Sequence, residues 1–320
     1  MGIPLATPAS RPGRRAAATL GLIFVLIGCE AAAGGPEQRA EGLLALSTGE
    51  DSRLDVIATA PDGAVAISLP LPEDGATWIS AGPDGSLVAT TVDGHLITSD
   101  PVDPRGTAVD VASLGWTPVE AKDESGESVP APASFPTWDP GGKRVAALGG
   151  DLADGAAVTL LIVEPSTGKL TTMTTRQPVL PGPPVWLDEN RVALPSGSDA
   201  EPASILIDTA SGKVMKGPPG DRRLTTSADG SVIATSAGPG APVVLRSTKG
   251  WLEDDGTSIG SVEVPKGFTE ATALALDATG RRLAIVWRRE DGTTQCDVHD
   301  GDDGWRRVLS HGGIVAAWLR

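Results

Sequence analysis

A two-part repeat runs through most of the chain: an alternating apolar segment ends in a turn containing Asp or Gly, and a second apolar run follows. Alternating strands of about 5–7 residues that meet at such turns form β-hairpins, because these turns need residues that tolerate positive φ. A unit of this kind predicts a four-stranded antiparallel sheet, which cannot bury both faces by itself, whereas sheets stacked radially can. The repeat therefore predicts an all-β β-propeller. The copies are TWISAGPDGSLVAT (77–90), FPTWDPGGKRVAAL (135–148), PPVWLDENRVALP (183–195), RLTTSADGSVIAT (223–235) and ALALDATGRRLAIV (273–286).

The spacing of the copies predicts the number of blades. The inner strands begin near residues 77, 134, 184, 222 and 271, and spacings of roughly 40–50 residues are usual for propeller blades. The first interval is longer because residues 117–132 form an insertion with loop composition. The last segment, 313–320, matches the inner strand at 183–188, while the strands expected over 42–70 have no inner strand before them. Joining these ends predicts a six-bladed β-propeller over residues 43–320, closed by a C-terminal strand that joins the N-terminal blade.

Two copies of the repeat are especially close in sequence. Residues 139–146 and 277–284 share the pattern D-x-x-G-[KR]-R-[VL]-A. Trp138, Trp186 and Trp318 occupy equivalent positions, which indicates packing between blades and not a platform for a ligand.

The turns that are closest to a known motif carry a family resemblance. Trp138-Asp139-Pro140-Gly141-Gly142, the turn 82–85 and the outer turns of the form D-x-x-[ST]-G-K are similar to those of TolB-like, WD40-type bacterial six-bladed propellers. The resemblance covers about residues 42–320. It implies the fold and structural roles for the motif, in which the turn folds the hairpin and the tryptophan packs between blades, and it implies no catalytic residue. Other copies depart from the motif: Ala228 and Ala278 replace the proline, and one residue is missing at 188–190.

The N-terminus has the pattern of an export signal. Arg11, Arg14 and Arg15 precede the apolar stretch 16–28, which is too short to span a bilayer as a stable helix. The sequence LIGC that ends at Cys29 resembles a bacterial lipobox, which implies cleavage before the cysteine and lipid on its thiol. We therefore expect a lipoprotein signal peptide over 1–28, a flexible tether over 29–42 and a lipid anchor at the extracytoplasmic face of the cell membrane. An ordinary secretory signal is the alternative, and Arg14-Arg15 leaves twin-arginine export open.

Net charge indicates which classes of partner to expect, and the cysteine content indicates the role of Cys296. The net charge is −15, and the leader contributes only positive charge. Such an acidic surface repels phosphate backbones, so we expect no nucleic-acid partner, whereas a basic protein or cell-envelope ligand would be attracted. Cys29 and Cys296 are the two cysteines, and we expect Cys296 to be a small buried apolar residue.

The search for catalytic and metal chemistry gives weak signals. Gly256–Gly260 matches G-x-S-x-G, but its flanks lack the strand-to-helix turn that a nucleophile elbow requires. The three histidines are not at metal-ligand spacing, and the acidic run 297–304 lacks the alternating ligands of a calcium loop, which favours a solvated hairpin tip. We therefore predict neither metal nor cofactor. The paired arginines 281–282, 288–289 and 306–307 are interpreted as solvated surface.

Trp116 is the one candidate for partner contact. It borders the long insertion and belongs to no repeat position, so it predicts either an anchor for a partner or packing under the loop. The function that this sequence favours is a non-catalytic module that binds a protein or envelope ligand. The alternative is a propeller-type hydrolase or lactonase with a carboxylate-lined channel. A sensor that works with a separate protein is not distinguished from the first interpretation.

Overall fold

In the computed structural model of the chain, the described strands all belong to one of two compact units, Arg39–Arg320. Cys29 and the predicted signal peptide lie outside the described residues. The structure describes residues 42–47, 53–58, 65–69, 71–73, 75–101, 115–122, 133–149, 157–198, 200–300, 304–309 and 314–318.

The strands form six four-stranded antiparallel sheets. Five of these sheets take their strands consecutively from the chain, and the remaining one has the order β24-β1-β2-β3. Each sheet is named below by its innermost strand, so the β4 sheet contains β4 to β7. The strands are β1 (Gly42–Ser47), β2 (Arg53–Ala58), β3 (Val65–Leu69), β4 (Trp78–Ala81), β5 (Leu87–Thr90), β6 (Leu96–Ser99), β7 (Trp116–Pro118), β8 (Ala133–Trp138), β9 (Val145–Gly149), β10 (Ala157–Glu164), β11 (Lys169–Pro178), β12 (Val185–Trp186), β13 (Arg191–Gly197), β14 (Pro202–Asp208), β15 (Val214–Pro219), β16 (Arg223–Thr226), β17 (Val232–Ser236), β18 (Val243–Ser247), β19 (Gly260–Val262), β20 (Phe268–Leu276), β21 (Arg282–Arg289), β22 (Thr294–Asp300), β23 (Gly304–Leu309) and β24 (Ile314–Trp318).

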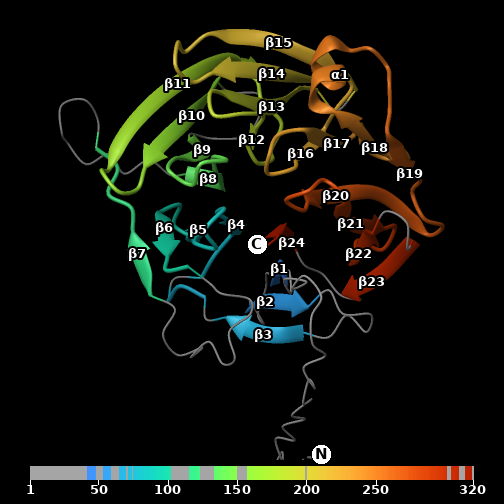
Figure 1. The fold of residues 1–320 in the computed structure, drawn as a ribbon, viewed down its shortest axis with the longest axis horizontal. Coiled ribbons are helices and arrows are strands. Elements are labelled where there is room, and N and C mark those ends of the chain that lie inside the picture. Colours follow the sequence, from blue (N-terminus) through green and yellow to red (C-terminus); the bar gives the residue numbers. More distant parts are fainter. Residues whose placement is uncertain are drawn as a thin grey trace, which may run out of the picture. The chain divides into compact units, whose positions relative to one another are not determined.

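Within this unit the sheets follow one another around a common centre, which is the arrangement of an all-β propeller (Figure 1). The innermost strands contact one another from sheet to sheet: β4 with β8, β8 with β12, β12 with β16, β16 with β20, β20 with β24, and β24 with β4. Apolar side chains fill the spaces between neighbouring sheets. One cluster joins Leu148 and Val158 of the β8 sheet to Trp186 and Ile205 of the β12 sheet, all of them buried. Burial between sheets is what a single four-stranded sheet cannot achieve alone.

The first and last described strands pair with each other. β1 is antiparallel to β24, with Leu43 opposite Trp318. Both side chains are buried in one cluster with Cys296 and Val298 of the β20 sheet. Cys296 is 2% exposed, so the prediction of a small buried apolar residue is confirmed, and burial raises the pKa of its thiol.

A one-turn helix, α1 (Thr248–Glu253), follows β18, and the hydroxyl of Ser247 caps it by accepting from the amide of Gly250. One local prediction was wrong. Asp297 does not lie in a solvated hairpin tip but within β22, where it is 8% exposed and accepts two hydrogen bonds from Gln295.

No helix among the described residues is long and apolar enough to cross a membrane.

Candidate functional site

The hairpin turns that follow the innermost strands gather on one face of the propeller. In an antiparallel four-stranded sheet, the loop after the first strand and the loop after the third strand lie at the same end. We call this end the turn face and the opposite end the connection face. The turn face of the β8 sheet therefore carries residues 139–144 and 165–168.

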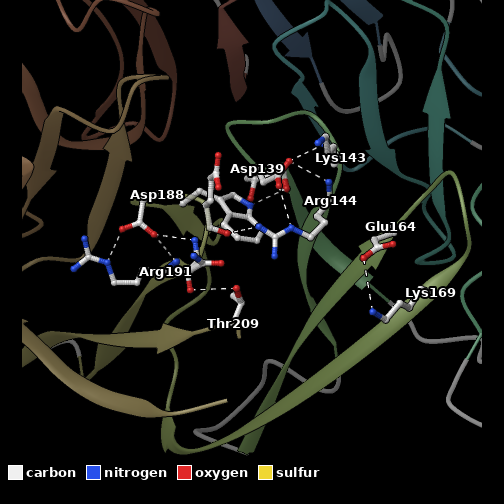
Figure 2. A network of polar contacts seen from close by, with 12 residues as sticks. Asp139, Lys143, Arg144, Glu164, Lys169, Asp188, Arg191 and Thr209 are labelled. Carbon is white, nitrogen blue, oxygen red and sulfur yellow. Dashed lines mark hydrogen bonds and ion pairs between the residues drawn. The ribbon is translucent and has the colours of Figure 1, made fainter. Parts of the chain in front are cut away.

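Two of these turns are held by a buried aspartate and an arginine. In the β8 sheet, Asp139 accepts from the backbone amides of Lys143 and Arg144 at 2.7 and 3.0 Å, and from Nε of Arg144 at 3.0 Å (Figure 2). In the β20 sheet, Asp277 accepts from the amides of Arg281 and Arg282 at 2.9 and 3.1 Å, and Nε of Arg282 lies 3.5 Å from its other oxygen. Each carboxylate is almost fully buried and is fully engaged by its own turn.

Each of these arginines also contacts a tryptophan of the next sheet. The guanidinium carbon of Arg144 lies 5.0 Å from the centre of the Trp186 ring, and its Nη2 donates to the carbonyl of Glu189. The indole of Trp186 donates back to the carbonyl of Thr137 at 3.3 Å. A carboxylate, a guanidinium and an indole thus join the β8 and β12 sheets, and we call this arrangement an arginine lock.

The same lock joins the β20 sheet to β24. The guanidinium of Arg282 lies 5.3 Å from the Trp318 ring, and the indole of Trp318 donates to the carbonyl of Ala275 at 3.0 Å. Thr137 and Ala275 each precede the lock aspartate by two residues, so the two locks have the same register. The interpretation of Arg281-Arg282 as solvated surface was therefore wrong for Arg282, whose side chain is 22% exposed.

The centre of the propeller holds a channel with an open volume of about 160 Å³. Its described lining consists mainly of hydroxyl, proline and tryptophan side chains from the innermost strands, such as Ser80, Thr226 and Trp186. Asp139 is the one carboxylate among these described lining residues, and the β8 turn engages it. The described lining therefore offers no pair of carboxylates for acid–base chemistry.

A larger groove, of about 750 Å³, lies on the turn face. It is lined by turns of three successive sheets, those of β4, β8 and β12, and it is bordered by Trp138. The groove contains more acidic than basic side chains, and Arg144 is already held by Asp139. The charged residues of its lining are Asp84, Asp139, Lys143, Arg144, Glu164 and Glu189.

Hydrogen bonds lower the pKa of two turn-face carboxylates, Asp208 and Asp229. The backbone amide of Ser211 is the main cause that lowers the pKa of Asp208, and the hydroxyl of Ser227 does the same for Asp229. Glu164 lies 4.0 Å from Lys169 across its own turn (Figure 2). Hydrogen bonding within these two turns therefore favours the ionised forms of Asp208 and Asp229.

Neither Trp116 nor Ser258 is among the described residues that line this groove. Trp116 is in β7, half-buried, and packs against the apolar cluster that contains Leu54 and Ile79. This contact is the packing role that was one of its two interpretations, and the partner-anchor role stays a prediction. Ser258 of the G-x-S-x-G match is exposed in the loop between α1 and β19, not on a strand-to-helix elbow. Among the described residues no group of three or more His, Cys, Asp or Glu is placed to hold a metal ion.

A buried carboxyl group beside α1 had no sequence signal. Asp221, 5% exposed, accepts from the indole of Trp251 in α1 at 2.7 Å, and its burial raises its pKa. Its partner lies 30 residues later in a helix that the repeat pattern did not predict.

Comparison with known proteins identifies the fold. No family model matches the sequence, and no curated protein matches it. TolB from Acinetobacter baumannii superposes with a TM-score of 0.61 at 16% identity, over 88% of this chain and 66% of that one. This chain thus spans about two thirds of the length of that TolB. A putative TolB from Agrobacterium tumefaciens gives 0.55 at 13% identity, over 87% and 92% of the two chains. A chain of a nidogen/laminin complex gives 0.54 at 9% identity, over 88% and 98%. The predicted resemblance is confirmed at the level of the fold: this chain has a β-propeller fold similar to that of TolB.

Proposed function

We propose that this protein is a non-catalytic binding module that recognises a protein or cell-envelope ligand through its turn face. The observation that carries the proposal is the groove of about 750 Å³ on that face, which turns of three successive sheets line with an excess of acidic side chains. A basic partner segment matches this charge. The nidogen/laminin complex contains a chain of the same fold, so a propeller takes part in a protein complex there.

The alternative is a hydrolase or lactonase that works in the channel. Such chemistry needs two carboxylates, or a carboxylate and a metal, with free lone pairs at the reacting atoms. Asp139 is the only carboxylate in the described channel lining, and its oxygens accept hydrogen bonds from Lys143 and Arg144. Because no second carboxylate lies beside it among these residues, we favour binding over catalysis.

The test is a matched pair of charge reversals on the two faces. The double variant Glu164→Lys/Glu189→Lys alters the groove, and Glu263→Lys/Glu290→Lys makes the same charge change on the connection face. We expect the groove variant to bind solubilised envelope protein about tenfold more weakly than the unaltered chain, and the control to differ by less than about twofold. Equal binding by both variants, or turnover of an ester or lactone by the unaltered protein, would contradict the proposal.

We propose in addition that lipid on Cys29 anchors the protein at the extracytoplasmic face of the cell membrane. The basic, apolar and cysteine pattern of residues 11–29 supports this. Palmitate labelling and membrane fractionation test it directly. The unaltered chain should carry label and sediment with membranes, whereas Cys29→Ser should carry none; retention of the label in that variant would exclude this anchor.

We propose finally that the β24 sheet closes the ring as a sixth blade. The support is that β24 contacts the β20 sheet through the same arginine lock that joins the β8 and β12 sheets, and that β24 also pairs with β1. A ring closed in this way holds the turns of the binding face at fixed positions.

A further inference from the structure

The junction between the β4 and β8 sheets lacks the arginine of the lock. Equivalent turn positions can be identified from the first hydrogen bond that closes each hairpin. The amide of Asp139 donates to the carbonyl of Arg144, that of Asp277 to Arg282, and that of Gly82 to Ser86. Gly82 and Ser86 therefore stand where the other two turns have the aspartate and the arginine.

The tryptophan of the lock is nevertheless present at this junction. Trp138 occupies the position of Trp186 and Trp318, but the β4 turn that precedes it supplies no guanidinium. Trp186 and Trp318 are 4% and 6% exposed, whereas Trp138 is only partly buried and lines the groove. Its indole N–H is buried and has no hydrogen-bond partner among the described residues, in contrast to those of Trp186 and Trp318.

A carboxylate also lies beside this indole. A Cβ placed on Gly82 would stand 3.1 Å from Oδ1 of Asp84 and 3.2 Å from Cδ1 of Trp138, so these two side chains border the same small volume. The same point is 2.9 Å from Oγ of Ser86. An aspartate cannot replace Gly82 without displacing its neighbours, and Asp84 supplies the negative charge instead. Two of the three components of a lock are thus in place, next to an open groove.

We propose that an arginine side chain of a protein partner binds at this junction, between Asp84 and the ring of Trp138. It would complete across the interface the lock that Arg144 and Arg282 form within the chain. Guanidinium is favoured over ammonium because its planar group can lie on an aromatic face while its edge bonds a carboxylate. The proposal rests on the proposed function, since it names the partner group that the turn-face groove receives.

The direct test follows the indole N–H resonances of the full-length protein by NMR during titration with an acetylated tetra-arginine amide. We expect the resonance of Trp138 to shift and those of Trp186 and Trp318 to stay in place. A matched tetra-lysine peptide should bind several-fold more weakly, by about fivefold. A Trp138 resonance that does not move at saturating tetra-arginine would overturn the proposal.

Two arginine variants separate this site from general charge attraction. Ser86→Arg places a guanidinium at the lock position of the β4 turn and should weaken tetra-arginine binding by about fivefold or more. Ser231→Arg is the control for an added positive charge on the turn face: the amide and hydroxyl of Ser231 are bonded to Asp229 as those of Ser86 are to Asp84, but Val232 and not Ser231 closes that hairpin. The next sheet there offers Leu276, not tryptophan, so this control should change binding by less than about twofold. Equal weakening by both variants would overturn the proposal.

The outcomes distinguish this inference from the proposed function. If the Glu164→Lys/Glu189→Lys variant no longer binds the partner and the Trp138 resonance does not shift with tetra-arginine, the groove binds the partner and the proposed arginine site is wrong. If Trp138 shifts with tetra-arginine while the groove variant retains full partner binding, the arginine site stands and the proposed groove is wrong. Trp138→Leu, whose folding is checked by its thermal midpoint, provides a second variant and should weaken tetra-arginine binding as much as Ser86→Arg.

Discussion

Two junctions of this propeller differ by a single guanidinium. Between the β8 and β12 sheets, Arg144 lies between the buried Asp139 and the ring of Trp186. Between the β4 and β8 sheets, a carboxylate and a tryptophan are present without an arginine, and an open groove takes its place. The same repeat position can therefore serve as an internal fastening or as a surface for a partner, depending on two residues of the preceding turn.

The largest effect should come from removing a locked indole. We expect Trp318→Ala to lose about 3–5 kcal/mol of unfolding free energy, because it removes a buried ring, a hydrogen bond to Ala275 and the Arg282 contact together. Trp138→Ala should lose less, about 2–3 kcal/mol, because its ring is partly exposed and its N–H is unbonded. Thermal unfolding measures both, and equal losses would show that the lock adds nothing to ring burial.

The next largest loss of stability should come from removing a lock aspartate, and it should exceed the loss from removing an ordinary turn aspartate. Asp277→Ala removes a carboxylate that is 1% exposed and leaves two amides and Arg282 without their acceptor, so we expect a loss of about 2–4 kcal/mol. Asp84→Ala removes an exposed carboxylate bonded to Ser86 and should lose about 0.5–1 kcal/mol. Chemical denaturation at neutral pH checks the difference. A loss for Asp84→Ala as large as that for Asp277→Ala would contradict the distinction between the two kinds of turn.

Removing only the indole N–H isolates the hydrogen bond of the lock. Trp186→Phe keeps an aromatic ring but leaves the carbonyl of Thr137 without its donor, so we expect a loss of about 1 kcal/mol beyond that of Trp138→Phe. Trp138→Phe removes a buried N–H that has no partner among the described residues, which offsets part of its lost packing. If Trp138→Phe is the more destabilising of the two, its indole is satisfied in solution and the two junctions are more alike than the structure indicates.

The sequence predicted the repeat unit and even the motif that contains the lock. The pattern D-x-x-G-[KR]-R-[VL]-A includes Asp139, Arg144 and their counterparts Asp277 and Arg282. Alternation along a strand shows which residues share a face, but it does not show that an arginine lies on a tryptophan more than 30 residues away in another sheet. That contact depends on how neighbouring sheets pack, which no local pattern contains.

The open junction could not be predicted for a related reason. The motif treats Trp138 and Trp186 as equivalent, and both were expected to be core. They differ because the β4 turn is shorter by one residue and has Gly82 and Ser86 at the lock positions, which becomes visible only in the hydrogen-bond register. Helix α1 was missed because its single turn is too short to show a 3.6-residue period.

The smallest expected effect concerns Trp251, whose indole is bonded to a carboxylate. It can be measured as a change of stability with pH. The indoles of the locks donate to backbone carbonyls, which do not titrate, whereas that of Trp251 donates to the carboxylate of Asp221. Burial raises the pKa of Asp221, so the folded state holds this proton more tightly than the unfolded chain does. The contribution of Asp221 to stability is then fully present below its unfolded pKa of about 3.8 and is lost as the pH rises through its higher folded value.

Asp221→Asn can still accept from Trp251 but cannot titrate, so the stability of the unaltered chain relative to this variant should fall across that pH interval and stay constant above it. Thermal midpoints of both proteins between pH 3.5 and about 8 measure the difference. A relative stability that rises with pH would mean that Arg246, 4.0 Å away, outweighs burial and holds Asp221 ionised in the fold.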